Sequence, residues 1–124
     1  MNQPRVLLVD DEEMVRSVVR RLLEPAGFTV SVVDSAASAK PALQSEQFEA
    51  VILDIRMPDV DGCELYRWMQ AEVPGLTDKV AFLTGEPITG TLARFIEETG
   101  RPVISKPFGR DELIESLRAI ARAT

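Results

Sequence analysis

Histidine is absent from the 124-residue chain, and cysteine occurs only once, at Cys63. The first absence excludes histidine-based catalytic triads, histidine metal ligands and a phosphohistidine within this chain. A single cysteine cannot form an internal disulfide, which is typical of proteins in a reducing compartment. No apolar run is long enough for a secretory signal or a membrane span, because Val6–Val9 stops at Asp10. We therefore predict a cytoplasmic protein without membrane contact.

Basic residues are in the minority: 14 Lys and Arg stand against 20 Asp and Glu, which gives a formal net charge of −6 at pH 7. Nucleic-acid binding needs clustered basic side chains, so this balance argues against a nucleic acid as a direct partner. The chain also lacks the glycine-rich patterns of nucleotide-binding loops. Its length and ordinary globular composition predict one domain, covering residues 1–124.

Short apolar runs alternate with longer amphipathic segments. The runs are nearly continuous and rich in β-branched residues, as in strands buried on both faces of a parallel sheet. They are Val6–Val9, Phe28–Val33, Ala50–Leu53, Val80–Leu83 and Pro102–Ile104. Helical spacing marks five helices around Met14–Leu23, Ala36–Ser45, Leu65–Met69, Leu92–Ile96 and Leu113–Ile120. The alternation predicts an α/β protein of five βα units, with a parallel sheet between two layers of helices.

Polar residues follow four of these runs: Asp10 and Asp11, Asp54, Thr84, and Lys106 after Ser105. The carboxyl ends of parallel strands lie along one edge of a sheet, where ligands bind in such folds. Three carboxylates, one hydroxyl and one ammonium should therefore converge. Two carboxylates ~4 Å apart repel by about 4 kcal/mol at an effective dielectric of ~20, so the group needs protonation or a cation.

Carboxylate oxygens without histidine or cysteine suit Mg²⁺, and Asp10 and Asp11 would bind it directly or through water. The arrangement fits phosphoryl transfer to a carboxylate, with Asp54 as the nucleophile. Mg²⁺ and Lys106 would neutralise charge on the phosphoryl oxygens, and the Thr84 hydroxyl would bond one of them.

Each of these residues alone has a structural interpretation. Asp10 and Asp11 could cap the first helix, and Asp54 could be a turn residue. Thr84 could be a turn or cap residue, and Lys106 a solvated charge. Asp34 also ends an apolar run and is assigned no chemistry. The combination of four strand ends, each with a suitable residue type, favours the phosphoryl site.

The same segments together resemble the receiver (response-regulator) domain of two-component signalling, over the whole chain. The resemblance lies in Val9-Asp10-Asp11-Glu12, Leu53–Gly62, Leu83-Thr84-Gly85 and Ser105-Lys106-Pro107-Phe108. It implies a doubly wound, flavodoxin-like sheet of order 2-1-3-4-5 and a cis peptide between Lys106 and Pro107.

The resemblance also implies roles in a phosphorelay. Asp54 would be the phosphoacceptor, and Thr84 and Lys106 would contact phosphoryl oxygens. The Mg²⁺ ligands would be Asp11, Asp54 and the backbone carbonyl of Arg56, with Asp10 acting through water. The donor would be a histidine kinase or a histidine phosphotransfer domain, and the output a downstream effector or an attached domain. Such a chain, a monomer or weak dimer, catalyses only its own phosphorylation and slow dephosphorylation.

Some positions depart from the family pattern or vary within it. Val103 stands where receivers often carry an aromatic residue, which removes that form of signal readout. Arg56 and Glu86 flank the site and either pair across its mouth, slowing water entry, or have no role. The segment from Phe82 to Pro102 is similar to receivers that end hybrid sensor kinases. This favours such an origin over a free-standing receiver.

Two other functions stay open from the residues. A phosphatase of the haloacid-dehalogenase type would use Asp10 as its nucleophile, but it needs Asp-x-Asp where this chain has Asp10-Asp11-Glu12. A receiver that no longer accepts phosphate would serve only as a protein-binding module.

Overall fold

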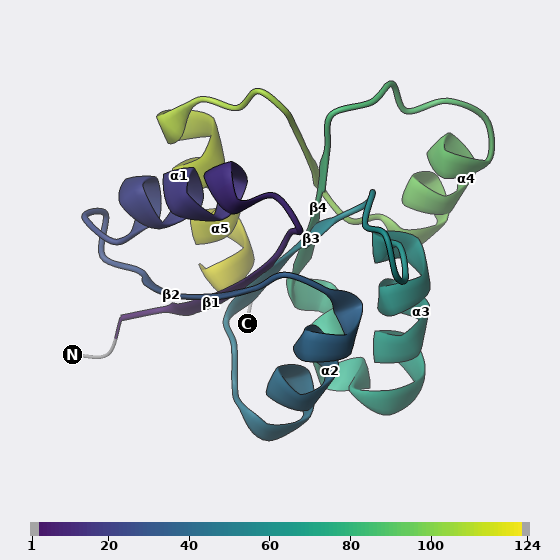
Figure 1. Cartoon of the computed structure of the whole chain (residues 1–124), viewed down its shortest axis with the longest axis horizontal. Helices are drawn as coiled ribbons and strands as arrows, with labels where there is room; N and C mark the ends of the chain where they lie inside the picture. Colours follow the sequence, from purple (N-terminus) through teal and green to yellow (C-terminus); the bar gives the residue numbers. More distant parts are fainter. Residues whose placement is uncertain (1–2, 123–124) are drawn as a thin grey trace.

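The computed structural model describes residues 3–122 and consists of five βα units in succession (Figure 1). The strands are β1 (Arg5–Val9), β2 (Thr29–Val33), β3 (Ala50–Asp54), β4 (Val80–Thr84) and β5 (Val103–Ser105). The helices are α1 (Glu13–Leu23), α2 (Ala36–Ser45), α3 (Gly62–Glu72), α4 (Gly90–Thr99) and α5 (Arg110–Arg122). A short 3-10 helix that the sequence did not predict, η1 (Pro74–Lys79), joins α3 to β4.

The strands form one parallel sheet in the order β2-β1-β3-β4-β5, which confirms the predicted order. Val9 at the end of β1 pairs with Leu53, and Asp54 at the end of β3 pairs with Leu83. Thr84 at the end of β4 pairs with Ser105. The polar residues that follow or end these strands therefore share one edge of the sheet.

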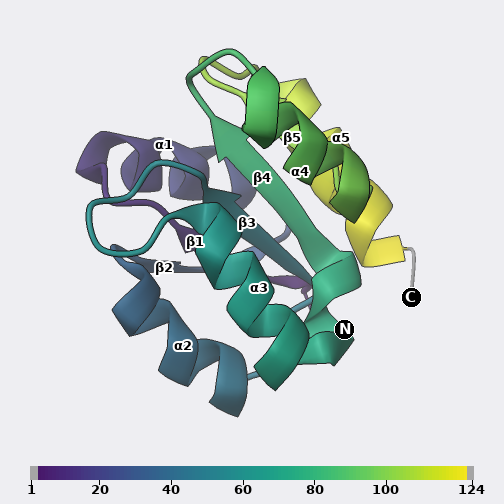
Figure 2. The same ribbon diagram turned by 90° about the vertical axis from the view of Figure 1, so that its right-hand side faces the viewer.

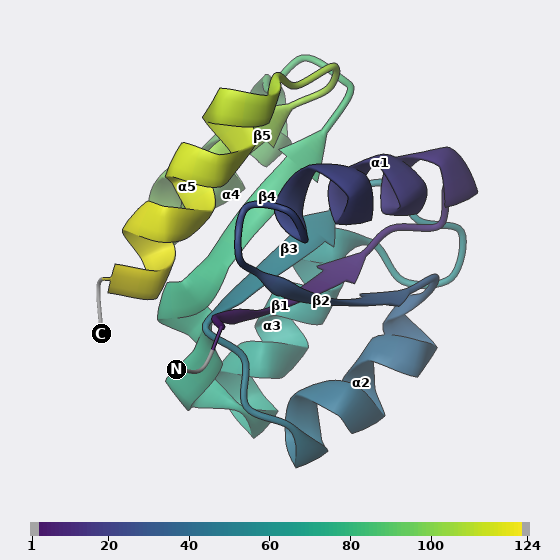
Figure 3. The same ribbon diagram turned by 90° about the vertical axis from the view of Figure 1, so that its left-hand side faces the viewer.

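Helices cover both faces of the sheet, with α1 and α5 on one side and α2, α3 and α4 on the other (Figures 1, 2 and 3). Alternate residues of β1 divide between the two cores: Val6 and Leu8 pack towards α1 and α5, whereas Leu7 and Val9 pack towards α2 and α3. Burial on both faces explains why the strand sequences are unbroken apolar runs. Within residues 3–122, none of the helices combines the length and apolar character needed to cross a bilayer.

Several helix ends follow from local side-chain chemistry. Ser35 caps α2 by accepting a hydrogen bond from the Ser38 N–H (3.1 Å), and Asp61 caps α3 by accepting one from the Glu64 N–H (2.8 Å). Gly100 ends α4 in the left-handed conformation that glycine adopts most readily, with φ of 66°.

Glycine at position 62 lets α3 begin directly against the end of β3. Its N–H donates to the Ile55 carbonyl (2.9 Å), and a Cβ atom placed on it would lie 2.5 Å from the Asp54 carbonyl oxygen. Non-bonded atoms clash at this distance, so any side chain at position 62 would push α3 away from the strand that carries Asp54. The position of the candidate site therefore depends on Gly62.

We predict that Gly62→Ala lowers the free energy of unfolding by about 2 to 4 kcal/mol, because the new methyl group meets rigid backbone. Gly75→Ala is the matched control, since a Cβ atom there has nothing within 4 Å. Urea unfolding of both variants measures the difference. Equal stability of the two variants would contradict the close approach.

Candidate functional site

The buried polar residues of the described chain lie together at the carboxyl edge of the sheet. They are Asp10, which follows β1, Asp54 at the end of β3, and Thr84 at the end of β4. Lys106 follows β5, and its N–H donates to the Thr84 carbonyl (2.7 Å). The structure thus brings two of the three sequence-predicted acids, Asp10 and Asp54, together with the predicted hydroxyl and ammonium.

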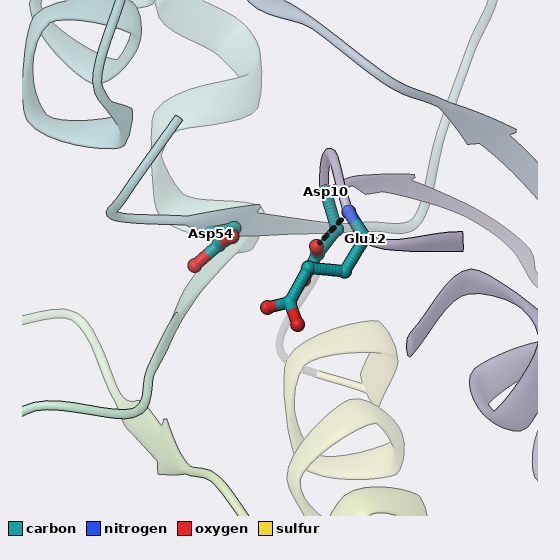
Figure 4. A group of neighbouring side chains, drawn as sticks. All are labelled: Asp10, Glu12 and Asp54. Atoms are coloured by element: carbon teal, nitrogen blue, oxygen red, sulfur yellow. Dashed lines mark hydrogen bonds between the residues drawn. The ribbon is translucent and has the colours of Figure 1, made fainter. Parts of the chain in front are cut away.

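Three carboxylates converge there. Oxygen atoms of Asp10, Glu12 and Asp54 all lie within 4.8 Å of one another, and Figure 4 shows the three side chains beside each other. Asp10 also organises the turn into α1, since its Oδ1 atom accepts a hydrogen bond from the Glu12 N–H (2.8 Å). Asp10 thus shapes the turn before α1 but does not cap the helix, because the N-cap is Glu12 and no side chain caps it.

Glu12 was not predicted as a member of the site, whereas Asp11 was. The turn that Asp10 forms brings position 12 back towards the strand ends and leaves Asp11 exposed, outside the cluster of oxygens. The Asp11 charge still acts on Asp54, whose pKa it helps to raise. Direct Mg²⁺ ligation by Asp11 stays a prediction, as does ligation by the Arg56 carbonyl. The sequence feature that could have identified Glu12 is Asp10, an aspartate two residues earlier that can accept a hydrogen bond from the Glu12 N–H.

Lys106 supplies the positive charge of the site. Its Nζ atom lies 2.9 Å from Glu12 Oε1, 3.2 Å from Asp10 Oδ2 and 3.5 Å from Asp54 Oδ2. Burial disfavours the charged ammonium, but the hydrogen bond to Glu12 and the attraction of Asp54 and Asp10 outweigh it. The pKa of Lys106 is therefore raised above its ordinary value, and the side chain stays charged. The predicted cis peptide between Lys106 and Pro107 is confirmed.

One ammonium does not balance these carboxylates. Burial and then repulsion from Asp10 raise the pKa of Asp54 to about 7, although the attraction of Lys106 opposes the shift. Burial also raises the pKa of Asp10 above its ordinary value. Both shifts show that the site disfavours its own negative charge and would favour a further cation.

The donor atoms of the site fit Mg²⁺. Asp10 Oδ2 is buried and, among the described residues, meets only the Lys106 ammonium, which lies 3.2 Å away. A buried carboxylate oxygen is costly to desolvate, and one ammonium shared among three carboxylates satisfies it only in part. Hard oxygen atoms from a few carboxylates are the ligands that Mg²⁺ prefers.

Thr84 and Lys106 stand on neighbouring strand ends beside the cluster. The Thr84 hydroxyl accepts a hydrogen bond from the Glu86 N–H (3.2 Å), so the turn interpretation of this residue is correct in the present state. The next residue, Gly85, lies beside the Lys106 side chain. A Cβ atom placed on Gly85 would be 3.7 Å from the Cβ and Cδ atoms of Lys106. The loop after β4 is thus close enough to respond to a change at Lys106 or Thr84.

Arg56 and Glu86 form an ion pair, which is one of the two alternatives that the sequence left open. Arg56 Nη2 lies 2.8 Å from Glu86 Oε2, and its Nε atom donates to the same oxygen at 2.9 Å. The pair joins the loop after β3 to the loop after β4. Its effect on water entry stays a prediction.

Aromatic side chains lie between α3, α4 and the sheet, but none of them comes from β5. Tyr66, Phe82 and Phe95 contact one another, with ring centroids 5.4 to 6.0 Å apart. Val103 packs against this cluster as the sheet partner of Phe82. Phe82 lies two residues before Thr84, so the cluster borders the strand that ends at the site.

Comparison with known proteins identifies the family. A sequence model of the family described as "Response regulator receiver domain" matches residues 6–118. The C4-dicarboxylate transport transcriptional regulatory protein DctD of Rhizobium meliloti is 37% identical over 115 residues, which are 93% of this chain and 25% of that protein. The chain spans about half or less of the length of the curated relatives it matches.

Solved structures show the same fold. A CheY-like response regulator receiver domain from Methanospirillum hungatei has a TM-score of 0.88 and 25% identity, over 98% of this chain and 95% of that one. The receiver domain of the sensor histidine kinase PA1611 from Pseudomonas aeruginosa has a TM-score of 0.86 and 24% identity, over 99% and 100% of the chains. Its structure is described with a magnesium ion coordinated in the active site cleft.

The raised pKa of Asp54 predicts a loss of stability with rising pH when no divalent cation is present. The carboxyl has an ordinary pKa of 3.8 and a folded pKa of about 7, so the folded state holds this proton more tightly. The contribution of Asp54 to stability is complete below the ordinary pKa and is lost as the pH rises through about 7. We expect Asp54→Asn to exceed wild type by about 1 to 3 kcal/mol at about pH 8.

Urea unfolding in the presence of a chelator, at about pH 5 and about pH 8, measures this effect on both sides of the shifted pKa. Asp34→Asn is the matched control, because it removes one negative charge from an exposed residue after β2. An equal loss of stability with pH in wild type and Asp54→Asn would show that Asp54 does not carry the effect.

Proposed function

Since this chain belongs to the family of response regulator receiver domains, the signalling domains of two-component systems, we propose that Asp54 is its phosphoryl acceptor. The observation that carries the proposal is the placement of Asp54 between Asp10, Lys106 and Thr84 at the strand ends. We propose further that the receiver domain covers residues 1–124.

In the proposed reaction, a carboxylate oxygen of Asp54 attacks the phosphorus atom of a phosphohistidine. The new O–P bond forms as the P–N bond breaks, and the imidazole leaves with the electron pair of that bond. Asp54 must be ionised to attack, so its raised pKa makes the reaction sensitive to nearby positive charge. Lys106 and Thr84 are placed to contact the phosphoryl oxygens during transfer.

The acidic residues would hold Mg²⁺ at the same edge. We propose Asp11, Asp54 and the Arg56 carbonyl as ligands, with Asp10 acting through water. When bound, the ion supplies positive charge that favours ionised Asp54 and offsets repulsion of the incoming phosphoryl group. The buried Asp10 Oδ2 atom, which shares the Lys106 ammonium with two other carboxylates, and the magnesium ion described for the PA1611 receiver support this assignment.

The phosphoryl donor would be a histidine kinase or a histidine phosphotransfer domain, since this chain has no histidine. Met14 and Val18, the large apolar residues that the described chain leaves exposed at 79% and 38%, lie one turn apart on α1, the helix that begins just after Glu12. Two exposed apolar side chains on one face of this helix suit contact with a protein donor. The receiver would act as a monomer or weak dimer in a protein without direct nucleic-acid or membrane contact, located in the cytoplasm.

The phosphoryl group would be read out through Thr84. In our proposal the Thr84 hydroxyl exchanges the Glu86 N–H for a phosphoryl oxygen and draws the loop after β4 inward. The change would pass to α4 through the cluster of Tyr66, Phe82 and Phe95, because Val103 replaces the aromatic residue on β5. A downstream effector or an attached domain would respond to the altered surface.

Intact mass after incubation with acetyl phosphate tests the acceptor directly. We expect wild type and Asp34→Asn to gain the mass of one phosphoryl group in the presence of Mg²⁺, and Asp54→Asn to gain none. The reason is that a carboxamide cannot form an acyl phosphate. Removal of Mg²⁺ with a chelator should abolish the gain in wild type.

Other outcomes would favour the other functions. Steady hydrolysis of a small phosphate ester that is lost in Asp10→Asn and kept in Asp54→Asn would favour the phosphatase. No gain of mass from acetyl phosphate or from a phosphorylated histidine phosphotransfer protein would favour the binding module.

A further inference from the structure

Glu12 is the partner that Lys106 contacts most closely. The Lys106 ammonium donates a hydrogen bond to Glu12 Oε1 at 2.9 Å, whereas its approaches to Asp10 and Asp54 are longer ion pairs. Glu12 lies just before α1 and its side chain is 59% exposed, while that of Lys106 is only 18% exposed. The cation of the site is therefore held by a carboxylate at its solvent-facing side.

Glu12 also lies close to the atom that would receive the phosphoryl group. Its carboxylate has an oxygen within 4.8 Å of an oxygen of Asp54. A phosphoryl group on Asp54 adds about 1.5 to 2 negative charges and three acceptor oxygens at this place. Glu12 and the phosphoryl group would then repel each other and compete for the same ammonium.

We propose that Glu12 is a resting-state counter-ion of Lys106 that opposes phosphorylation, an inference that rests on Asp54 being the acceptor. In the unphosphorylated protein Glu12 binds the Lys106 ammonium. When the phosphoryl group is present, Lys106 turns to its oxygens and the Glu12 carboxylate moves into solvent. Glu12 thus sets how strongly the site favours the phosphorylated state.

Asp10 cannot act as the releasable counter-ion, although it also forms an ion pair with Lys106. Asp10 is fully buried, and the Glu12 N–H holds its Oδ1 atom in place. Glu12 has a longer and more exposed side chain, so it can leave the ammonium without losing a buried contact. Because exposed ion pairs are weak, the expected effect is a change of a few fold and not a complete block.

A role as a metal ligand makes the opposite prediction for Glu12. Its carboxylate belongs to the same cluster of oxygens, so it could in principle bind Mg²⁺. A ligand would strengthen Mg²⁺ binding and thereby phosphorylation. A counter-ion of Lys106 leaves Mg²⁺ binding nearly unchanged and weakens binding of the phosphoryl group.

The test uses beryllium trifluoride, a mimic of a phosphoryl group on a carboxylate, titrated calorimetrically into the whole chain at saturating Mg²⁺. Glu12→Gln removes the charge that holds Lys106. Glu13→Gln is the matched control, because Glu13 is the adjacent exposed acid, while the ion pairs of Lys106 in the described chain are with Asp10, Glu12 and Asp54. Mg²⁺ affinity without the mimic is measured for both variants.

We expect Glu12→Gln to bind the mimic about two- to fivefold more tightly than wild type and Glu13→Gln to differ from wild type by less than about 1.5-fold. The two variants should bind Mg²⁺ alike. A structural defect at position 12 would weaken binding of the mimic, so tighter binding cannot arise from damage to the fold.

Four results would overturn the inference. Weaker mimic binding by Glu12→Gln than by Glu13→Gln would make Glu12 a residue that positions Lys106 for the phosphoryl group. A loss of Mg²⁺ affinity confined to Glu12→Gln would make it a metal ligand. Equal mimic binding by both variants would leave the contact without effect. If wild type and Asp54→Asn bind the mimic equally, the acceptor assignment fails and this inference fails with it.

Discussion

The contact of one ammonium with two buried carboxylates and one exposed carboxylate is the constraint on which the rest of the site depends. Lys106 lies within ion-pair distance of Asp10, Glu12 and Asp54, yet burial and mutual repulsion still raise the pKa of Asp54 to about 7. The folded chain therefore holds a site that is short of positive charge. Such a site favours a divalent cation first and, with its help, a phosphoryl group on a carboxylate.

The fold produces this concentration of charge by simple geometry. Because the strands are parallel, the residues at the ends of β1, β3, β4 and β5 lie along one edge of the sheet. Helices on both faces exclude water from the strands. The start of α3 packs directly against the end of β3 because position 62 is glycine. Rigid packing around Asp54 keeps the carboxylates close even though they repel one another.

Most of this arrangement could be predicted from the sequence, because it depends on patterns that extend along the chain. The alternation of apolar runs and helical spacing predicted the five βα units, and the strand-end residues predicted the members of the buried site. The observed β5 begins and ends one residue later than predicted. Pro102 has no N–H to donate to the sheet, although its carbonyl accepts a hydrogen bond from the Phe82 N–H. The short helix η1 carried no apolar periodicity and was missed.

Side-chain positions within a turn were harder to predict than the elements. The sequence did not show that the hydrogen bond from Glu12 N–H to Asp10 turns position 12 towards Lys106 and leaves Asp11 exposed. One local hydrogen bond and the attraction of Lys106 determine which of the two side chains faces the site. Neither interaction produces a repeating pattern in the sequence. The sequence leaves the pairing of Arg56 with Glu86 open, because it indicates only that both residues flank strand ends.

The most direct measurement of the central claim is the effect of Mg²⁺ on thermal stability at about pH 8, for wild type and Asp54→Asn. If the site is short of one cation, wild type gains stability with added Mg²⁺, by about 1.4 kcal/mol at ten times the dissociation constant. Asp54→Asn, which lacks the ionised carboxylate, should gain much less. An equal gain in both proteins, or none in wild type, would contradict a cation site built around Asp54.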